Sequence, residues 1–293
     1  MGKRSGGTDT LRTPSGKARL AGVFGWPVAH SLSPRLHGYW LASYGIDGAY
    51  VPLAVRPEDF GDALRTLPRL GFAGVNVTVP HKEAALAAAD RADDGAKRIG
   101  AANTLVFGDG GRIEASNTDA FGFLENIRAT IPGWSGAAGP AVVLGAGGAA
   151  RAVVAALIEA GAPEVRLVNR TADRAKAVAA HIGGPVAVVP WAERADALAG
   201  AAILVNTTVL GMTGKPALDL DLGRLPSGAI VNDIVYVPLE TPLLKAAARR
   251  GHQVVDGLGM LLHQARPGFR AWFGVAPSVT ADLRAYVLGA MTS

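Results

Sequence analysis

The sequence contains no cysteine among its 293 residues. This absence excludes disulfide bonds, a thiolate nucleophile and a cysteine zinc site. The six histidines show no paired spacing with carboxylates that would form a metal cage, so we expect no metal. No window of about 18 consecutive apolar residues could form a membrane helix, and the N-terminus lacks the apolar segment of a secretory signal. We therefore expect a cytoplasmic protein without a membrane partner.

Charged residues are sparse, at 18%, and the net charge of +5 comes largely from the N-terminus. Residues 1–19 hold five basic residues and one acid among Gly, Ser and Thr, a composition typical of a disordered tail. The rest of the chain is nearly neutral, with 24 basic and 23 acidic residues. Because the body carries no clustered basic stripe, we expect no nucleic-acid partner.

Strand-like and helix-like segments alternate from about residue 19 onward, which is typical of parallel sheets with crossover helices. The length suggests two domains. We predict an α/β fold in which an N-terminal substrate domain with a mainly parallel sheet, residues 20–119, faces a C-terminal Rossmann domain with a doubly wound parallel sheet, residues 120–258. Helices within 259–290 are expected to fold back onto the first domain, with a cleft and a hinge between the two domains.

The local patterns also predict individual elements. In the first domain we expect strands at 19–25, 49–55 and 74–79, helices at 34–44 and 57–67, and a hairpin of strands 102–107 and 112–116. Ser33 is the expected N-cap of the helix that begins at Pro34. In the second domain we expect strands near 186–189, 201–206, 229–234 and 253–256, and a helix at 242–250.

The segment 141–170 is the most informative part of the chain, because an apolar strand leads into a glycine turn, a helix and a second strand. Gly145, Gly147 and Ala150 fit the GxGxxG/A spacing of dinucleotide-binding turns. The first glycine allows the tight turn, the second lets the backbone approach a pyrophosphate, and the small third residue lets the helix pack on the strand. The helix that starts near Gly148 would direct its unpaired N–H groups at the phosphates.

The second strand of this unit ends in Asn169-Arg170-Thr171, where NAD-binding proteins usually place a carboxylate. A carboxylate would repel a ribose 2′-phosphate, whereas Arg170 and Arg174 would attract it and match its oxygens in a bidentate manner. These residues favour NADP over NAD. The alternative is that both arginines belong to a solvated helix face.

Polar side chains follow the predicted strands of the first domain. Asn76 and Thr78 share one face of a strand that ends at Pro80, and Lys82 lies in the first turn of the next helix. The carboxyl ends of parallel strands are where ligands bind in such sheets, and a lysine at a helix start is opposed by the helix dipole. Each feature also has a plain structural alternative, such as a solvated lysine. The same holds for the helix start at 31–34, the turn at 101–104 and the helix cap at 117–119.

Taken together, these motifs resemble the shikimate dehydrogenase family over nearly the whole chain after residue 20. The motifs that carry the resemblance, in order, are Ser31-Leu-Ser33-Pro34, Asn76-Val-Thr78-Val-Pro80-His-Lys82, Gly100-Ala-Ala-Asn103-Thr104, Asn117-Thr118-Asp119, Gly145-Ala-Gly147-Gly148-Ala149, Asn169-Arg170-Thr171 and Asp256-Gly257-Leu-Gly259-Met260-Leu-Leu-His-Gln264. The resemblance implies reversible reduction of 3-dehydroshikimate to shikimate with NADPH, in aromatic amino acid biosynthesis.

The resemblance also implies roles for single residues. Lys82 and Asp119 match the family's catalytic pair. The implied substrate-binding residues are Ser31, Ser33, Asn76, Thr78, Asn103, Tyr236 and Gln264. The implied cofactor-binding residues are Gly145, Ala146, Gly147, Gly148, Ala149, Asn169, Arg170, Thr171, Arg174, Thr207, Ile234, Gly257 and Asp94.

The residues themselves support this chemistry, because ketone reduction by hydride needs a nearby group that exchanges a proton with the reacting oxygen. A lysine ammonium beside a carboxylate can do this, and we assign the proton transfer to the pair without choosing its acceptor. Two alternatives remain at this level: a quinate/shikimate dehydrogenase with relaxed specificity and a non-catalytic nucleotide-sensing module. We expect the protein to act as a monomer or homodimer.

Overall fold

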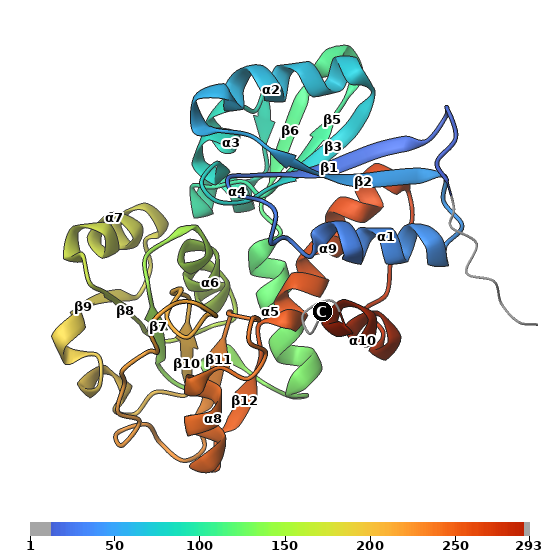
Figure 1. Ribbon diagram of the computed structural model, residues 1–293. Coiled ribbons are helices and arrows are strands. Elements are labelled where there is room, and N and C mark those ends of the chain that lie inside the picture. The colour runs from blue at the N-terminus through green and yellow to red at the C-terminus, as the bar shows by residue number, and fades with distance from the viewer. Residues whose placement is uncertain (1–12, 290–293) are drawn as a thin grey trace, which may run out of the picture.

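The computed structural model describes residues 13–289, which form two α/β lobes side by side (Figure 1). Each lobe is built on a six-stranded sheet. Of the basic tail predicted over 1–19, residues 1–12 lie outside the described residues. The Ser15 amide donates to Asp47 Oδ1 at 3.0 Å, and the first strand begins at Arg19. The folded part of the chain therefore begins by residue 15, earlier than predicted.

The sheet of the first lobe has the order β2-β1-β3-β5-β6-β4. Its strands are β1 Arg19–Gly25, β2 Gly48–Ala54, β3 Phe72–Val77, β4 Arg91–Ala92, β5 Thr104–Phe107 and β6 Ile113–Ser116. Three strands, β2, β1 and β3, run parallel, whereas β5 and β6 form the predicted antiparallel hairpin with Phe107 opposite Ile113. The side chains of β1 alternate between the two faces, so Ala21 and Val23 enter one core cluster and Phe24 another.

The helices that follow these strands are α1 Ser33–Ser43, α2 Phe60–Thr66, α3 Lys82–Ala88 and α4 Asp94–Ile99. The prediction that Ser33 caps α1 is wrong, because the capping position is Leu32 and no side chain caps the helix. Instead the Ser33 amide donates to Ser31 Oγ at 3.3 Å, so the residue before the cap satisfies this N–H group. The Ser33 hydroxyl is thereby left for other partners.

Strand β4 and helix α4 are absent from the predictions made from the sequence. They have two and six residues, which is too short for an apolar repeat to be recognised. A local signal does exist at the start of α4, because the carboxylate of Asp93 accepts from the Ala96 amide at 2.6 Å and caps the helix.

The second lobe contains a fully parallel sheet of order β12-β11-β10-β7-β8-β9. Its strands are β7 Ala141–Leu144, β8 Val165–Asn169, β9 Val186–Pro190, β10 Ile203–Asn206, β11 Ile230–Asp233 and β12 Gln253–Val255. Its helices are α6 Gly148–Glu159, α7 Ala172–Ile182 and α8 Pro242–Arg249. This is the strand order of a doubly wound Rossmann sheet, with the switch of direction at β7, so the predicted fold class is confirmed.

Both faces of this sheet are covered, which explains why its strands are continuously apolar. Ala141 and Val143 of β7 pack on the side of α6, while Val142 and Leu144 pack on the side of α8. All four side chains are inaccessible to solvent. Full burial of a valine or leucine side chain stabilises the fold by about 1.5–3 kcal/mol, so this strand anchors the glycine turn that follows it.

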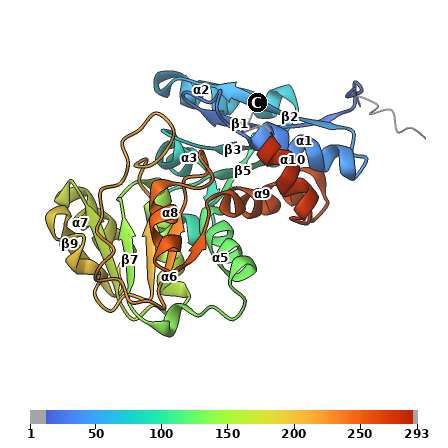
Figure 2. The ribbon, with the colours of Figure 1, turned by 60° about the horizontal axis from the view of Figure 1, so that its bottom comes forward.

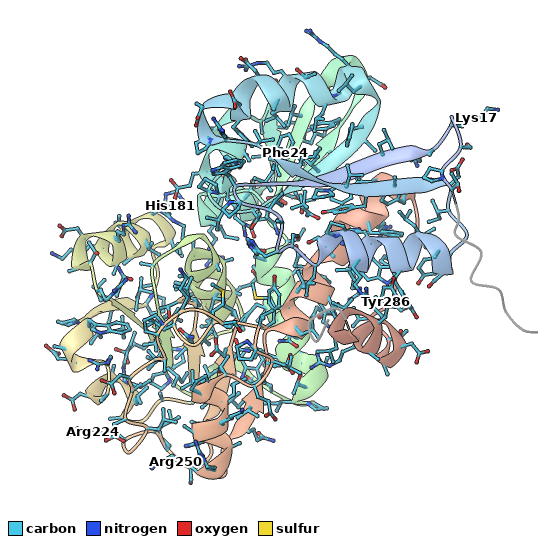
Figure 3. The ribbon with its side chains drawn as sticks, viewed as in Figure 1. Lys17, Phe24, His181, Arg224, Arg250 and Tyr286 are labelled. Atoms are coloured by element: carbon cyan, nitrogen blue, oxygen red, sulfur yellow. The ribbon has the colours of Figure 1, made fainter. Side chains whose placement is uncertain are left out.

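Three further helices remain: α5 Asp119–Thr130 and α9 Leu258–Phe273, which join the lobes, and α10 Ala281–Gly289. Helix α5 packs against α9, while α9 and α10 lie beside α1 and share a core cluster with β1 (Figure 2). The C-terminal helices therefore pack on the first lobe. A second contact lies at the edge formed by α4 and α7, where His181 Nε2 is 3.1 Å from the Lys97 carbonyl oxygen (Figure 3).

Candidate active site

A cavity of about 280 Å³ lies between the lobes and is lined by residues of both. It contains the predicted catalytic and substrate-binding residues Ser31, Ser33, Asn76, Thr78, Lys82, Asn103, Asp119, Tyr236 and Gln264. Four of the predicted cofactor-binding residues also line it, namely Gly148, Ala149, Ile234 and Gly257. Residues from distant parts of the sequence are thus brought to one cavity.

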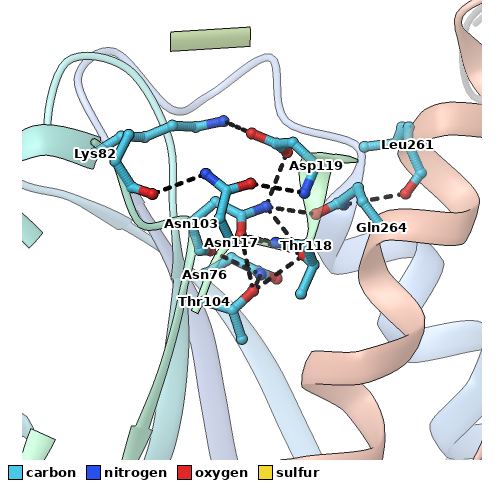
Figure 4. Close-up of polar contacts among 10 residues, drawn as sticks. Asn76, Lys82, Asn103, Thr104, Asn117, Thr118, Asp119, Leu261 and Gln264 are labelled. Atoms are coloured by element: carbon cyan, nitrogen blue, oxygen red, sulfur yellow. Dashed lines mark hydrogen bonds and ion pairs between the residues drawn. The ribbon is translucent and has the colours of Figure 1, made fainter. Parts of the chain in front are cut away.

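Lys82 and Asp119 form an ion pair through Lys82 Nζ and Asp119 Oδ2 (Figure 4). Their side chains are only 16% and 8% exposed, so solvent screens this pair far less than a surface pair. Each residue is the first of its helix. The positive end of the helix dipole therefore disfavours the Lys82 ammonium in α3 and favours the Asp119 carboxylate in α5. The carboxylate therefore offsets the unfavourable position of the ammonium group.

Asn103 connects this pair to the rest of the cavity (Figure 4). Its Nδ2 lies 2.8 Å from Asp119 Oδ1, 3.0 Å from Thr118 Oγ1 and 3.2 Å from Gln264 Oε1. Its Oδ1 accepts from the Thr118 amide at 2.8 Å. Asn117 Oδ1 accepts from the Asp119 amide at 3.0 Å, so the first turn of α5 is fixed on both sides. This network orients the Asp119 carboxylate toward Lys82.

Gln264 reaches the network because α5 and α9 approach each other very closely. A methyl group on Gly122 would lie 2.5 Å from Gln264 Cβ and 2.8 Å from the Met260 carbonyl oxygen. A methyl group on Gly259 would lie 1.8 Å from Asn126 Oδ1. Only glycine fits at these two positions, and the resulting helix contact holds Gln264 beside Asn103.

Behind Asn76, which lines the cavity, lies a buried polar group that no motif predicts. Tyr50 Oη donates to Asn76 Oδ1 at 2.7 Å, and the ring of His37 stacks on Tyr50 with centroids 3.9 Å apart. Asn76 Nδ2 then donates to the Asn103 carbonyl oxygen at 3.1 Å. Burial lowers the pKa of His37 to about 3, against a smaller opposing effect of the Asn76 side chain, so this imidazole is neutral.

The glycine turn closes the opposite side of the cavity. Gly145 has φ +107°, and a methyl group there would lie 2.7 Å from Thr207 Oγ1. The Thr207 hydroxyl donates to the Leu144 carbonyl oxygen at 2.6 Å, which supports the turn from behind. Helix α6 starts at Gly148, where a methyl group would lie 3.6 Å from Lys82 Cδ. The start of this helix and the lysine side chain therefore face each other.

The other predicted cofactor-binding residues lie outside the cavity. Arg170, Thr171 and Arg174 are exposed where β8 ends and α7 begins, and Asn169 Nδ2 donates to the Thr171 carbonyl oxygen at 2.8 Å. Asp94 is not brought to this group, because it lies on α4 with a fully exposed carboxylate 3.7 Å from Lys97 Nζ.

Several lining and supporting residues were not predicted from the sequence: His30, Tyr50, Thr104, Thr118, Asp233 and Met260. Thr104 and Thr118 belong to motifs that the sequence analysis singled out, so a polar side chain at a strand end was the available signal. Tyr50 and Asp233 depend on contacts between distant segments, which spacing does not reveal.

A doubly wound sheet with a glycine turn at its switch point, facing a buried amine and carboxylate across a cavity, defines a dinucleotide-dependent oxidoreductase.

Within residues 13–289, no helix has the length and apolar character to cross a bilayer.

Comparisons with known proteins identify the family. The profile of the shikimate dehydrogenase substrate binding domain matches residues 23–105, that of shikimate / quinate 5-dehydrogenase matches 134–211, and that of the shikimate 5′-dehydrogenase C-terminal domain matches 257–285. Shikimate dehydrogenase (NADP(+)) from Paramagnetospirillum magneticum is 64% identical over 274 residues, covering 94% of this chain and 99% of that protein. The chain belongs to the shikimate dehydrogenase family.

Solved structures of dehydrogenases are also similar to this chain. Shikimate 5-dehydrogenase from Thermus thermophilus in complex with NADP(H) and shikimate is 41% identical, with a TM-score of 0.82 over 93% of this chain and 99% of that one. Quinate dehydrogenase from Corynebacterium glutamicum in complex with NAD is 32% identical, with a TM-score of 0.86 over the same shares of the two chains. Both have the fold described above.

Proposed function

We propose that this protein catalyses the reversible reduction of 3-dehydroshikimate to shikimate with NADPH, with Lys82 and Asp119 as the proton-transferring pair. The observation that carries the proposal is their ion pair inside a cavity walled by both lobes. The names and bound ligands of the relatives support the substrate and the cofactor. The presence of both charged groups argues against a module that binds nucleotide without turnover.

The cofactor, when bound, supplies the hydride, and the protein supplies the proton. The Lys82 ammonium has three donors and lies where it can donate to the carbonyl oxygen of the substrate. Asp119 keeps that ammonium in place and, in the reverse direction, the pair accepts the proton from the hydroxyl group. The limited exposure of both side chains keeps bulk water from competing for the same contacts.

The remaining polar groups of the cavity fit a hydroxylated ring acid. We assign Ser31, Ser33 and Tyr236 to the carboxylate, since all three can donate from a hydroxyl group. Asn76, Thr78, Asn103 and Gln264 are assigned to the ring hydroxyls, because amides and hydroxyls both donate and accept. A site that hydrogen-bonds substrate hydroxyls strongly rejects analogues that lack them.

NADP fits the residues of the second lobe. A methyl group on Gly147 would meet no other atom within 4 Å, so the backbone is open to a phosphate, and α6 begins directly after it. We assign Gly145, Ala146, Gly147, Gly148 and Ala149 to the pyrophosphate and Thr207, Ile234 and Gly257 to the nicotinamide side. Asn169, Arg170, Thr171 and Arg174 are assigned to the ribose 2′-phosphate.

Two broader expectations belong to this proposal. The substrate domain comprises residues 20–119 together with the helices within 259–290, and the nucleotide domain comprises 120–258; the packing of α9 against β1 and β3 supports this division. We also propose that the protein acts in the cytoplasm as a monomer or homodimer, without nucleic acid. Light scattering on the purified protein tests the oligomeric state.

Absorbance at 340 nm with NADP or NAD, each against shikimate and quinate, tests the reaction. We expect the highest kcat/KM with NADP and shikimate. Comparable values with quinate would replace the proposal with the quinate/shikimate alternative. No turnover in any combination would favour the nucleotide-sensing alternative.

Lys82→Ala tests the catalytic pair. General acid or base assistance is worth about 10²–10⁴ in rate, so we expect kcat to fall at least a hundredfold while the Kd for NADPH stays unchanged. Lys97→Ala is the matched control, because Lys97 is 63% exposed and lies outside the cavity. Near-normal turnover of Lys82→Ala would refute the role of the pair.

A further inference from the structure

Asp233 is a buried carboxylate that the reaction described above does not use. It is the last residue of β11 and is completely inaccessible to solvent. Among residues 13–289, the only other buried carboxylate is that of Asp119, and no ion pair in this part of the chain involves Asp233. Burial raises the pKa of Asp233 to about 6. A carboxylate buried without a counter-ion is destabilising unless hydrogen bonds compensate, so its position needs an explanation.

Three donors from two segments converge on this carboxylate. Oδ1 accepts from Asn206 Nδ2 at 3.0 Å and from the Val235 amide at 3.1 Å, and Oδ2 accepts from Thr241 Oγ1 at 2.7 Å. Because an ionised carboxylate only accepts, the Thr241 hydroxyl donates to it, while its oxygen accepts from the Leu244 amide at 3.3 Å. Three converging donors require an acceptor-only group, which an aspartate is and an asparagine is not.

Two of these bonds hold the segment between β11 and α8 at both of its ends, residues 235 and 241. Ile234 and Tyr236 flank the anchored amide, and both line the cavity. The Ile234 backbone is also confined from the other side, since a methyl group on Gly257 would lie 2.3 Å from its carbonyl oxygen. Tyr236 is the one proposed substrate-binding residue that the second lobe contributes.

The third bond reaches the loop after β10. Asn206 Oδ1 accepts from the Thr208 amide at 3.1 Å, and its Nδ2 also lies 3.1 Å from the Leu210 carbonyl oxygen. Thr207 in the same loop supports Gly145 of the glycine turn. The carboxylate of Asp233 thus links the segment after β11, which lines the cavity, to the loop after β10, which supports the glycine turn.

We propose that Asp233 is a positioning residue, whose carboxylate ties the 234–241 segment to the 207–211 loop and thereby sets Ile234 and Tyr236 for substrate binding and hydride transfer. This inference rests on the proposed function and deepens it. The phosphate-binding residues at 145–149 and 170–174 make no contact with Asp233 in the hydrogen bonds of the described residues. Asp233 therefore acts mainly on the reacting end of the cofactor and on the substrate, and it reaches the glycine turn only indirectly, through the loop that contains Thr207.

Asp233→Ala, Asp233→Asn and Thr241→Val test this, with kinetics at 340 nm and NADPH binding measured by fluorescence. Misplacement by about 1 Å can lower a rate a hundredfold, so we expect Asp233→Ala to lower kcat/KM for shikimate about tenfold to a hundredfold while the Kd for NADPH changes less than about twofold. Asp233→Asn keeps an oxygen for Asn206 and Val235 but presents a donor to Thr241, so it should recover only part of the activity. Thr241→Val, which removes one anchor, should lie between the wild type and Asp233→Ala.

Leu225→Ala is the control for lost stability, because Leu225 is buried in the same lobe and lies outside the cavity. Kinetics of Asp233→Ala equal to those of Leu225→Ala would overturn the inference, and so would a Kd for NADPH that rises as much as KM. If Asp233→Ala does not fold, wild-type kinetics in both Asp233→Asn and Thr241→Val overturn it. A wild-type protein inactive on shikimate would instead overturn the proposed function itself.

Discussion

The close contact of α5 and α9 makes a sharp prediction for Gly122→Ala. Gly122 lies one turn after Asp119 in α5, and its added methyl group would stand 2.5 Å from Gln264 Cβ and 2.8 Å from both the Gln264 amide nitrogen and the Met260 carbonyl oxygen. Two of these three atoms belong to the backbone of α9, so no side-chain rotation relieves the overlap. The two helices must move apart.

The size of this movement follows from the distances. An ordinary contact begins near 3.4 Å, so α9 must retreat by roughly 1 Å relative to α5. The Asn103 Nδ2 to Gln264 Oε1 distance, already 3.2 Å, would then exceed hydrogen-bonding range. A misplacement of about 1 Å can lower catalysis a hundredfold. Overpacking should also destabilise the fold by about 1–3 kcal/mol, offset by about 1 kcal/mol from the better helix propensity of alanine.

Steady-state kinetics with shikimate and thermal unfolding measure both effects. We expect kcat/KM to fall about tenfold to a hundredfold, with the Kd for NADPH unchanged. Gly38→Ala is the matched control, because Gly38 is an exposed helical glycine with no atom within 4 Å of an added methyl group. It should stabilise the protein by about 0.4–1 kcal/mol and leave the kinetics unchanged. Wild-type kcat/KM in Gly122→Ala would refute the argument that glycine is required at this contact.

Two further predictions concern charge. Arg170→Ala should raise the Kd for NADPH about tenfold to a hundredfold, because it removes the proposed charged partner of the 2′-phosphate, and it should leave NADH binding unchanged. Fluorescence titration measures both affinities, and equal effects on the two cofactors would remove Arg170 from the proposed phosphate site. His37 has a pKa of about 3 in the folded protein and about 6.5 in the unfolded chain, so between these pH values only the unfolded chain binds a proton at this residue. The free energy of unfolding therefore decreases as pH falls from about 6.5 to about 3, by up to roughly 4–5 kcal/mol. His37→Phe should remove that loss of stability, which urea unfolding between pH 7 and pH 4 measures. The raised pKa of Asp233 has the opposite effect on stability as pH falls, and this effect is the same in the wild type and in His37→Phe. An unchanged pH dependence in His37→Phe would contradict the account of His37.

The glycine turn and the strand-end motifs could be predicted because each depends on a short stretch of sequence. Gly145, for example, needs a positive φ, and the apolar strand before it and the helix after it are both visible in the sequence. The same holds for Lys82 and Asp119, each at the first turn of a helix that follows a strand. The family motifs then connected segments that spacing alone could not.

Other features could not be predicted because they depend on contacts between distant segments. Tyr50 reaches Asn76 only because β1 lies between β2 and β3 in register. Gly122 reads as an ordinary helical glycine until α9, about 140 residues later in the chain, packs against it. In both cases the local sequence is also typical of an ordinary strand or helix residue, and the role of the residue becomes visible only from its contacts in the fold.

The contacts between the lobes also bear on how the cavity opens. On one side, α5 and α9 are held by buried packing and by the Asn126 Nδ2 bond to the Asp256 carbonyl oxygen at 2.7 Å. On the other side, Arg151 of α6 lies 3.8 Å from Glu83, whose side chain is 71% exposed. A surface pair of this kind contributes about 0–1 kcal/mol. Opening about the α5–α9 side would break this pair and the contact of His181 with the Lys97 carbonyl oxygen, and would leave the packing of α5 against α9 in place.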